Sequence, residues 1–393
     1  MVAQNAGTPP PSAMLLSGIV PPLADSFYQR PESGLALRNG LYPGDTVVLI
    51  QDEPIAPGPA GQGGTGKTQL AVSYAYALWS IRAVEVLIWV TATSREAIVT
   101  GFAEAARTVG AGLPGEAGRA AEGGLGERGL GERGLGKRGL GERGRGERGL
   151  SAEEAAERFA GWMAGTGRRW ALILDDLRDP ADLEQLWPAG PAGQVVITTR
   201  LSGQGLDALS SAAGRNSATG GGSRPPNLRI APVGGFTQRE TLAYLSSRLS
   251  DNPGQRLEAA ELGEDLDGLP LSLAQAAAVM KLSGLTCREY RAQFAERREH
   301  MSGVRVDGVS AAMLATWSLA AECAHRLPPA GLAWPTLALA ALLDVHGIPA
   351  AVLTSPAACG YITGRASTAG GHDRELVRAA ISNLAGAGLI SLD

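Results

Sequence analysis

The stretch Gly61-Gln-Gly-Gly-Thr-Gly-Lys-Thr68 matches the pattern GxxxxGK[ST] at every fixed position. A polyphosphate needs a loop whose backbone N–H groups can crowd around it, and glycine permits that close approach. The lysine supplies a point charge for the β- and γ-phosphate oxygens, and the threonine supplies a hydroxyl for Mg²⁺. The pattern therefore predicts a nucleotide-binding phosphate loop that opens a helix.

The lysine of this motif is informative because lysine is rare in the chain. It occurs at positions 67, 137 and 281 only, in a sequence of 393 residues. In this composition the full pattern is expected by chance on the order of 0.01 times. We predict that Lys67 binds phosphate oxygens and that Thr68 binds both nucleotide and Mg²⁺. The other predicted nucleotide-binding residues of the motif are Gly61, Gly63, Gly64, Thr65, Gly66 and Gln69.

Strands and helices alternate around the phosphate loop. Continuous apolar runs of the kind found in buried parallel strands occur at Thr46–Ile50, Val86–Val90, Trp170–Leu174 and Val195–Thr199. Helices are predicted over Lys67–Trp79, from a capping box at Thr93 and Glu96 to Val109, and from a second box at Ser151 and Glu154 to Met163. This alternation predicts a parallel α/β sheet flanked by helices. Residues Gln51–Ala60, with three prolines, separate the first strand from the loop.

Two carboxylates follow the third predicted strand, at Asp175 and Asp176. A carboxylate at the carboxyl end of a buried strand can reach the water shell of Mg²⁺, and a second one beside it can activate the attacking water. We predict that Asp175 binds Mg²⁺ and that Asp176 is the catalytic base; the alternative is the same pair with the two roles swapped. Arg200 ends the fourth strand, where its guanidinium can reach a γ-phosphate, so Arg200 joins Lys67 as a predicted catalytic residue.

Two low-complexity segments interrupt the α/β region. Residues 124–150 repeat the unit Gly-Leu-Gly-Glu-Arg, and residues 202–226 are rich in Ser, Gly and Ala. A glycine at every second or third position is too costly to order as a helix or strand. We predict insertions at about 113–150 and 202–226, and an irregular proline-rich arm over 1–25.

The chain becomes helical beyond residue 228. A capping box at Thr237 and Glu240 opens a helix to Leu249. Further helices are predicted over Leu257–Asp267, Leu271–Leu282, Cys287–His300, Ala311–His325, Thr336–Leu343 and Leu376–Ala387, with a β-like end at Leu389–Leu392. Gly268-Leu-Pro-Leu271 precedes one of these helices with a proline at its first position.

The ordered set Gly61–Thr68, Leu172–Asp176, Val195–Arg200 and Gly268–Leu271 resembles the NB-ARC family of STAND-class P-loop ATPases, including bacterial members with tetratricopeptide repeats. The resemblance implies a P-loop domain over 26–227, a helical domain over 228–304 with the GLPL motif, and a partial winged-helix domain over 305–393. It implies that the protein holds ADP at rest, exchanges it for ATP and rearranges or forms a homo-oligomer. By motif position, Arg200 senses the γ-phosphate and Pro270 lies against the adenine.

The match to the family has two gaps and one weak element. Phe27–Glu32 is only weakly similar to the family's adenine-side entry segment. The Met-His-Asp motif of the winged-helix domain is missing from its context, because His372-Asp373 precedes the last predicted helix rather than following it. The sequence shows no tetratricopeptide periodicity.

Three functions are compatible with the sequence. The first is a nucleotide-controlled signalling switch with slow Mg²⁺-dependent ATP hydrolysis. The second is a nucleotide-bound scaffold that does not turn over. The third, a winged-helix transcriptional regulator, is disfavoured because residues 305–393 hold five arginines and six acidic residues, whereas a DNA-reading domain is basic.

Composition restricts partners and compartment. The net charge is −4, with 44 % hydrophobic and 19 % charged residues, so neither nucleic acid nor an anionic membrane is expected as a partner. The longest apolar stretch, Gly331–Leu343, is broken by Pro335 and is too short to span a bilayer. Three widely spaced cysteines favour neither disulfides nor zinc. These features predict a cytoplasmic protein.

Overall fold

The computed structural model describes residues 14–30, 37, 41–51, 63–110, 150–217, 228–304, 306, 309–343, 347–364 and 371–392. Contacts between Cα atoms group the chain into two compact units. The first unit is assigned residues 1–20, 41–48 and 75–229, and the second residues 21–40, 49–74 and 230–393.

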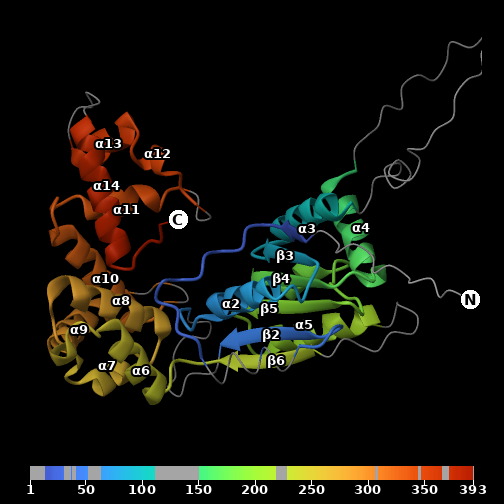
Figure 1. The fold of residues 1–393 in the computed structure, drawn as a ribbon, viewed down its shortest axis with the longest axis horizontal. Helices are drawn as coiled ribbons and strands as arrows, with labels where there is room; N and C mark the ends of the chain where they lie inside the picture. Colours follow the sequence, from blue (N-terminus) through green and yellow to red (C-terminus); the bar gives the residue numbers. More distant parts are fainter. Residues whose placement is uncertain are drawn as a thin grey trace, which may run out of the picture. The chain divides into compact units, whose positions relative to one another are not determined.

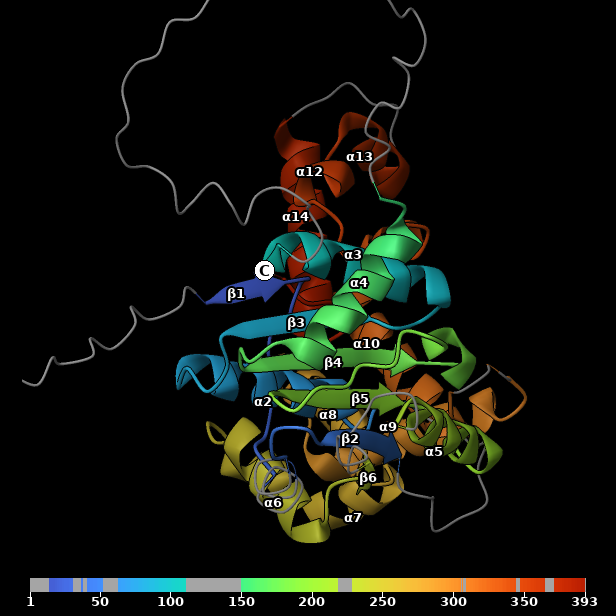
Figure 2. The same ribbon diagram turned by 90° about the vertical axis from the view of Figure 1, so that its right-hand side faces the viewer.

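A six-stranded sheet is the centre of the α/β region, with the strand order β1-β3-β4-β5-β2-β6 (Figure 2). The pairs β1–β3, β3–β4 and β4–β5 are parallel. The strands are β1 (Leu15–Ser17), β2 (Thr46–Gln51), β3 (Val86–Thr91), β4 (Trp170–Leu177), β5 (Gly193–Thr199) and β6 (Leu228–Val233). The predicted parallel α/β sheet is confirmed.

The four predicted strands correspond to β2, β3, β4 and β5, which are buried along almost their whole length. Such continuous apolar runs need both faces of a sheet to be covered. The edge strands β1 and β6 were not predicted, because β1 has only three residues and β6 is partly exposed. The arm predicted over 1–25 is therefore wrong at β1, while residues 1–13 lie outside the described part.

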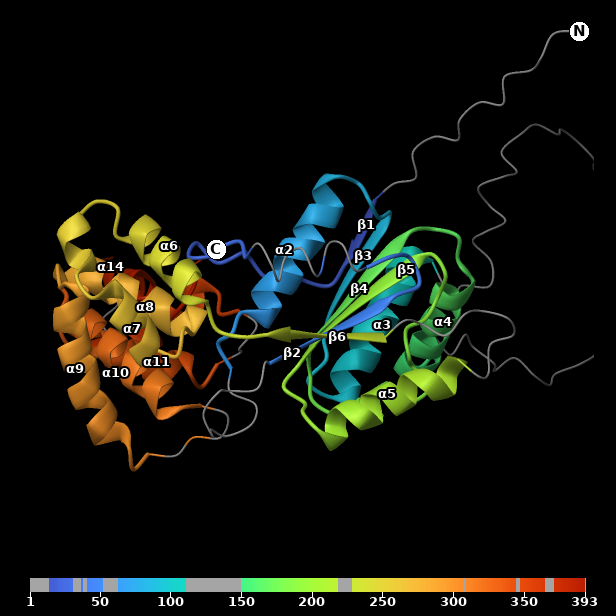
Figure 3. The same ribbon diagram turned by 90° about the horizontal axis from the view of Figure 1, so that it is seen from below.

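The first unit carries helices α3 (Arg95–Val109), α4 (Ala152–Gly165) and α5 (Gln204–Ser217), together with the 3₁₀ turn η1 (Pro180–Leu183). Figure 3 shows α3, α4 and α5 on one side of the sheet. The rings of Phe102 on α3 and Phe159 on α4 meet edge to face, with their centroids 5.4 Å apart. The box at Ser151 and Glu154 caps α4 as predicted, whereas Ser94 rather than Thr93 caps α3.

The predicted insertions have different outcomes. Most of 113–150 lies outside the described residues, although α3 ends in a left-handed cap at Gly110 before it and α4 begins directly after it. The loop predicted over 202–226 is wrong for its first part, because α5 occupies Gln204–Ser217 and buries Leu209 and Ala213. Residues 218–227 lie outside the described part.

Beyond the sheet, the second unit is helical (Figure 1). Its elements after residue 230 are α6 (Gln238–Arg248), η2 (Pro253–Arg256), α7 (Ala259–Asp265), α8 (Pro270–Ser283), α9 (Cys287–Met301), α10 (Ala311–Arg326), α11 (Ala333–Ala340), α12 (Ala350–Leu353), α13 (Pro356–Thr363) and α14 (Gly371–Gly386). Capping boxes open α6 at Thr237 and α9 at Thr286. No helix in the described part of the chain is long and apolar enough to cross a membrane.

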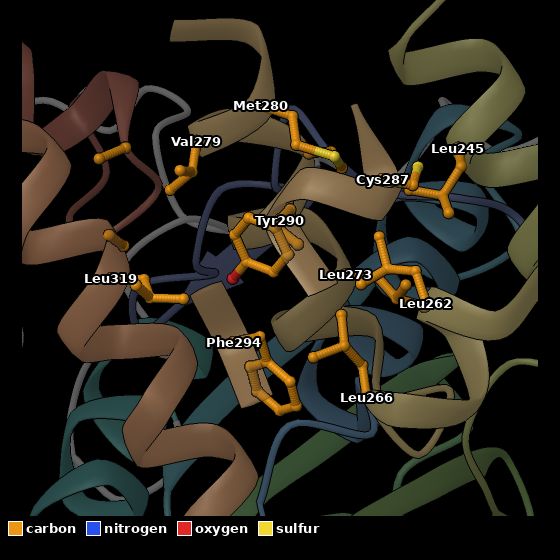
Figure 4. Packing of buried hydrophobic residues seen from close by; sticks show 14 of the residues in the cluster. Leu245, Leu262, Leu266, Leu273, Val279, Met280, Cys287, Tyr290, Phe294 and Leu319 are labelled. Carbon is orange, nitrogen blue, oxygen red and sulfur yellow. The ribbon is translucent and has the colours of Figure 1, made fainter. Parts of the chain in front are cut away.

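One apolar cluster holds helices α6 to α10 together (Figure 4). Tyr290 and Phe294 of α9 lie at its centre and stack with ring centroids 6.5 Å apart. Around them pack Leu245, Leu262, Leu266, Leu273, Val279, Met280, Cys287 and Leu319. Burial of this many large side chains makes α6 to α10 one packed helical body.

The last part of the chain is helical in the described residues, apart from an isolated antiparallel bridge between Val306 and Val309. The β-like end predicted at Leu389–Leu392 is wrong, because residues 389–390 form a bend and residues 391–392 have no regular secondary structure. The winged-helix assignment of 305–393 and the domain boundaries stay predictions. The fold is that of an α/β P-loop NTPase followed by a helical region.

Candidate functional site

Glycines give the phosphate loop its shape. Gly64 and Gly66 have φ angles of 91° and 89°, which L side chains rarely adopt. They lead into α2 (Lys67–Ser80), a helix of 14 residues without an acidic side chain in its first turn. The first N–H groups of such a helix have no intrahelical acceptor and favour an anion. Gly61, the first residue of the motif, lies outside the described residues.

Lys67 and Thr65 meet within this loop. The Lys67 ammonium donates to Thr65 Oγ1 at 3.3 Å, and the two residues are 9 % and 2 % exposed. Thr68 follows as the second residue of α2. A nearly buried ammonium at the mouth of a glycine-rich loop fits the predicted role of Lys67, because burial strengthens its attraction to phosphate.

The side chain of Gln69 has a structural role. Its Oε1 accepts from the Ala24 backbone N–H at 2.7 Å, and its Nε2 donates to the Pro22 carbonyl at 3.4 Å. These bonds tie the segment before the loop to α2. The predicted contribution of Gln69 to nucleotide binding stays a prediction.

The phosphate loop contacts the GLPL motif within the second unit. Helix α8 begins at Pro270, which has no N–H, and Leu269 makes no side-chain cap. The first amide of the helix is that of Leu271, which donates to the Gly64 carbonyl at 3.3 Å. A Cβ on Gly64 would lie 2.7 Å from Met313 Cε of α10. The structure thus places two motifs that are 200 residues apart in direct contact.

The segment Phe27–Arg30 packs onto the same helical body. Arg30 is 4 % exposed and donates from both terminal nitrogens to the Gly234 carbonyl at 2.9 Å. Its guanidinium lies 4.7 Å from the centre of the Phe236 ring. Burial lowers the pKa of Arg30, and the charge of Glu240 opposes that shift. A narrow pocket lies beside Phe27, Arg30 and Tyr74, and Glu32 is outside the described residues.

The acidic pair lies in a distortion of β4. The strand does not end at Asp175-Asp176 as predicted but continues to Leu177. Its pairing with β5 shifts between Leu174 and Leu177, which marks a β-bulge. Asp176 takes a left-handed backbone conformation with a φ of 57°. Such conformations are uncommon outside glycine and concentrate at functional sites.

The Asp176 carboxylate is held by two arginines of the first unit. Oδ2 accepts from Arg178 Nε at 3.2 Å and Nη2 at 3.1 Å, and Oδ1 lies 3.3 Å from Arg200 Nε. The arginine side chains are 65 % and 52 % exposed, so these ion pairs are weak and exchangeable. The structure brings Arg200 to the predicted base, a contact that the sequence does not indicate, and Arg178 was not predicted at all.

Thr198 is a second unpredicted member of the acidic site. Its hydroxyl donates to Asp175 Oδ1 at 2.6 Å and accepts from the Asp176 backbone N–H at 2.8 Å. It lies in β5, where a threonine is an ordinary strand residue. Among the described residues, no group of three or more His, Cys, Asp or Glu side chains lies close enough together to hold a metal ion.

Comparison with known proteins gives structural likeness only. No family model matches the sequence, and no curated protein matches it. A Walker-type ATPase of Pyrococcus abyssi is 14 % identical over 92 % of this chain and 89 % of that chain, with a TM-score of 0.38. The Orc1 protein of Aeropyrum pernix, solved in complex with DNA, is 18 % identical over 91 % and 81 %, with a TM-score of 0.31. Cdc6p of Pyrobaculum aerophilum is 15 % identical over 82 % and 66 %, with a TM-score of 0.32.

Proposed function

We propose that this chain is a nucleotide-controlled switch of the STAND type, which binds ADP or ATP and hydrolyses ATP slowly with Mg²⁺. The observation that carries the proposal is the bond from the Leu271 N–H to the Gly64 carbonyl. Through it the phosphate loop supplies the acceptor for the first amide of α8. A loop that rearranges around a nucleotide would alter this cap, so the helical body has a direct means of responding to the nucleotide.

Each residue of the loop has a role in this proposal. Lys67 neutralises the β- and γ-phosphates, and the amides at the start of α2 donate to phosphate oxygens. Pro270 lies against the adenine, as the resemblance to NB-ARC proteins implies. The bound nucleotide sets the conformation of the switch in the cytoplasm, and the ATP-bound form associates with further copies.

Thr68 and Asp175 are the proposed ligands of Mg²⁺. The donor chemistry fits, because Mg²⁺ prefers hydroxyl and carboxylate oxygens, and Asp175 Oδ1 accepts a hydrogen bond from Thr198 at 2.6 Å. When bound, the cation neutralises charge on the phosphates. The hydrogen bond from Thr198 orients the Asp175 carboxylate, which would hold the cation.

Arg200 is proposed to exchange its partner, from the Asp176 carboxylate to the γ-phosphate of ATP. The Arg200 guanidinium pairs with Asp176 at 3.3 Å, and a γ-phosphate is a stronger partner for the same donors. When Arg200 turns to the phosphate, one oxygen of Asp176 is released to accept a proton from water. This coupling makes hydrolysis depend on a complete triphosphate and keeps the resting rate low.

Phosphate release from Mg·ATP tests this assignment with Asp176→Asn. Asparagine tolerates the left-handed conformation of position 176, so the fold survives. Loss of a general base lowers a rate by about 10²–10⁴-fold, and we expect at least about 10² here, with ADP binding retained. Asp179→Asn is the matched control, because Asp179 is a nearby acid that only caps η1. Equal rates for Asp176→Asn and the wild type would contradict the assignment.

A non-hydrolysing scaffold is the second candidate. It is favoured by the two arginines that already occupy both carboxylate oxygens of Asp176. A wild-type protein that binds ADP and ATP tightly but releases no phosphate would support it. The same experiment thus separates the two candidates.

A further inference from the structure

We propose that Thr198 is the positioning residue of the acidic pair, with one hydroxyl that orients Asp175 and fixes the backbone of Asp176. The inference deepens the proposed ATPase site and rests on it for its effect on catalysis. Thr198 touches both acids, whereas the sequence indicates nothing beyond a strand residue at this position.

The β-bulge creates the place that Thr198 fills. Leu174 pairs with Ile197, and Leu177 pairs with Thr199. Two residues of β4, Asp175 and Asp176, therefore face the single residue Thr198 of β5. A bulge of this kind interrupts the ladder of backbone hydrogen bonds and re-aims side chains. The Thr198 hydroxyl supplies an acceptor for the Asp176 amide at that interruption.

The direction of both hydrogen bonds follows from counting protons. The Asp176 backbone N–H can only donate, so Thr198 Oγ1 is its acceptor. A hydroxyl has one proton, and Asp175 Oδ1 lies 2.6 Å away to receive it. The single hydroxyl proton is thereby directed at Asp175 Oδ1, and an ionised carboxylate is the form of aspartate that binds a divalent cation.

Burial makes this arrangement rigid. Thr198 is 2 % exposed, so water does not compete for its hydroxyl. An unmade hydrogen bond to a charged group in such a place is costly. Partners that orient metal ligands in this way typically cost 10–100-fold in metal affinity or activity when removed.

Thr199 offers a natural comparison. It is adjacent on β5 and fully buried, and its hydroxyl donates to the Leu177 carbonyl at 2.6 Å and accepts from the Leu201 N–H at 3.0 Å. The two threonines have the same size, strand and burial, and each bonds to one donor and one acceptor. Only Thr198 bonds to the acids. A structural role is shared by both, and a positioning role belongs to Thr198 alone.

The test compares Thr198→Val, Thr198→Ser and Thr199→Val in the full chain. Valine keeps the shape and removes the hydroxyl, and serine restores it. Three properties are measured: hydrogen exchange of the Asp176 amide, Mn²⁺ affinity in the presence of ADP by electron paramagnetic resonance, and phosphate release. Circular dichroism checks folding, and Thr198→Ala replaces the valine variant if that variant does not fold.

We expect Thr198→Val to weaken Mn²⁺ binding by about 10–100-fold and to accelerate exchange of the Asp176 amide by about tenfold or more. Thr198→Ser recovers both properties, and Thr199→Val changes neither. Equal effects of the two valine variants, an unchanged Thr198→Val, or a wild type that binds no Mn²⁺ with ADP would each overturn the proposal.

Failure of the proposed function gives a different result. A wild type that binds Mn²⁺ and ADP but releases no phosphate removes ATP hydrolysis. In that case the amide exchange and the Mn²⁺ affinity still decide whether Thr198 positions the pair.

Discussion

Gly64 shows how one residue joins the phosphate loop to the helical body. It has a φ of 91°, it accepts the Leu271 amide, and a side chain on it would meet Met313. Gly66 has a similar φ of 89°, but no described residue lies within 4 Å of an added Cβ there. The two glycines therefore share the same backbone requirement and differ in their surroundings.

Gly64→Ala should destabilise the protein more than Gly66→Ala. Each alanine in this backbone region costs about 1–3 kcal/mol, and Gly64→Ala must also displace the end of Met313. Urea denaturation midpoints of the two variants measure the difference. An equal or greater loss of stability with Gly66→Ala would show that the contact between position 64 and Met313 of α10 does not affect stability.

At the residue scale the sequence predicts charges and glycines better than it predicts their partners. Lys67, Gly64 and Asp175 follow from a pattern because the chemistry demands those residue types at those spacings. Thr198 does not, because a buried strand favours threonine for its shape alone. The role of Thr198 arises from the register between β4 and β5, which cannot be read from the sequence of either strand alone.

At the element scale, α9 and α10 are joined by charge. Arg297 of α9 donates to the Glu322 carboxylate of α10, which also receives Arg326 from its own helix. The hydrogen bond from Arg297 is the main reason that the pKa of Glu322 is lowered from its ordinary value of 4.5. An acid whose pKa is lowered by folding stabilises the folded state above its unfolded-state pKa and loses that contribution as the pH falls through its folded-state pKa.

Glu322→Gln should weaken the dependence of stability on pH below about 4.5. The wild type loses free energy of unfolding as the pH falls in this window, and the variant loses less because one linked proton is removed. Denaturation at a series of pH values measures the slope. Glu157→Gln, an exposed acid on α4, is the control. Identical slopes for Glu322→Gln and the wild type would rule out this ion pair as a source of the dependence.

Elements with a local signal were predicted, and those that depend on partners were not. The capping boxes of α4 and α6 each depend on only four consecutive residues, so the local sequence is enough to predict them. Helix α5 was not predicted, because its Ser, Gly and Ala content is typical of a loop. Leu209 and Ala213 nevertheless have the spacing of a buried helical face. The short strand β1 exists only through its pairing with β3, so its own three residues could not reveal it.

At the scale of the whole molecule, the sequence order and the compact units differ. Residues 49–74, which contain the phosphate loop, group with residues 21–40 and with the helical region from 230 onward. Two hydrogen bonds inside that unit help to explain the grouping. The Ala24 N–H donates to the Gln69 side chain, and the Leu271 N–H donates to the Gly64 carbonyl. Contiguous segments could not predict this, because the grouping depends on contacts between distant parts of the chain. The residues of the phosphate loop therefore belong to the same compact unit as the helical region.

The most direct measurement is the nucleotide content of the purified protein, prepared without added nucleotide, denatured and analysed by ion-exchange chromatography. Lys67→Ala tests the loop, and Lys281→Ala is the control, because Lys281 forms only an exposed ion pair with Asp251. The proposed switch predicts about one ADP per chain from the wild type and Lys281→Ala, and none from Lys67→Ala. Equal nucleotide from Lys67→Ala, or none from a wild type that also fails to bind added Mg·ADP, would contradict it.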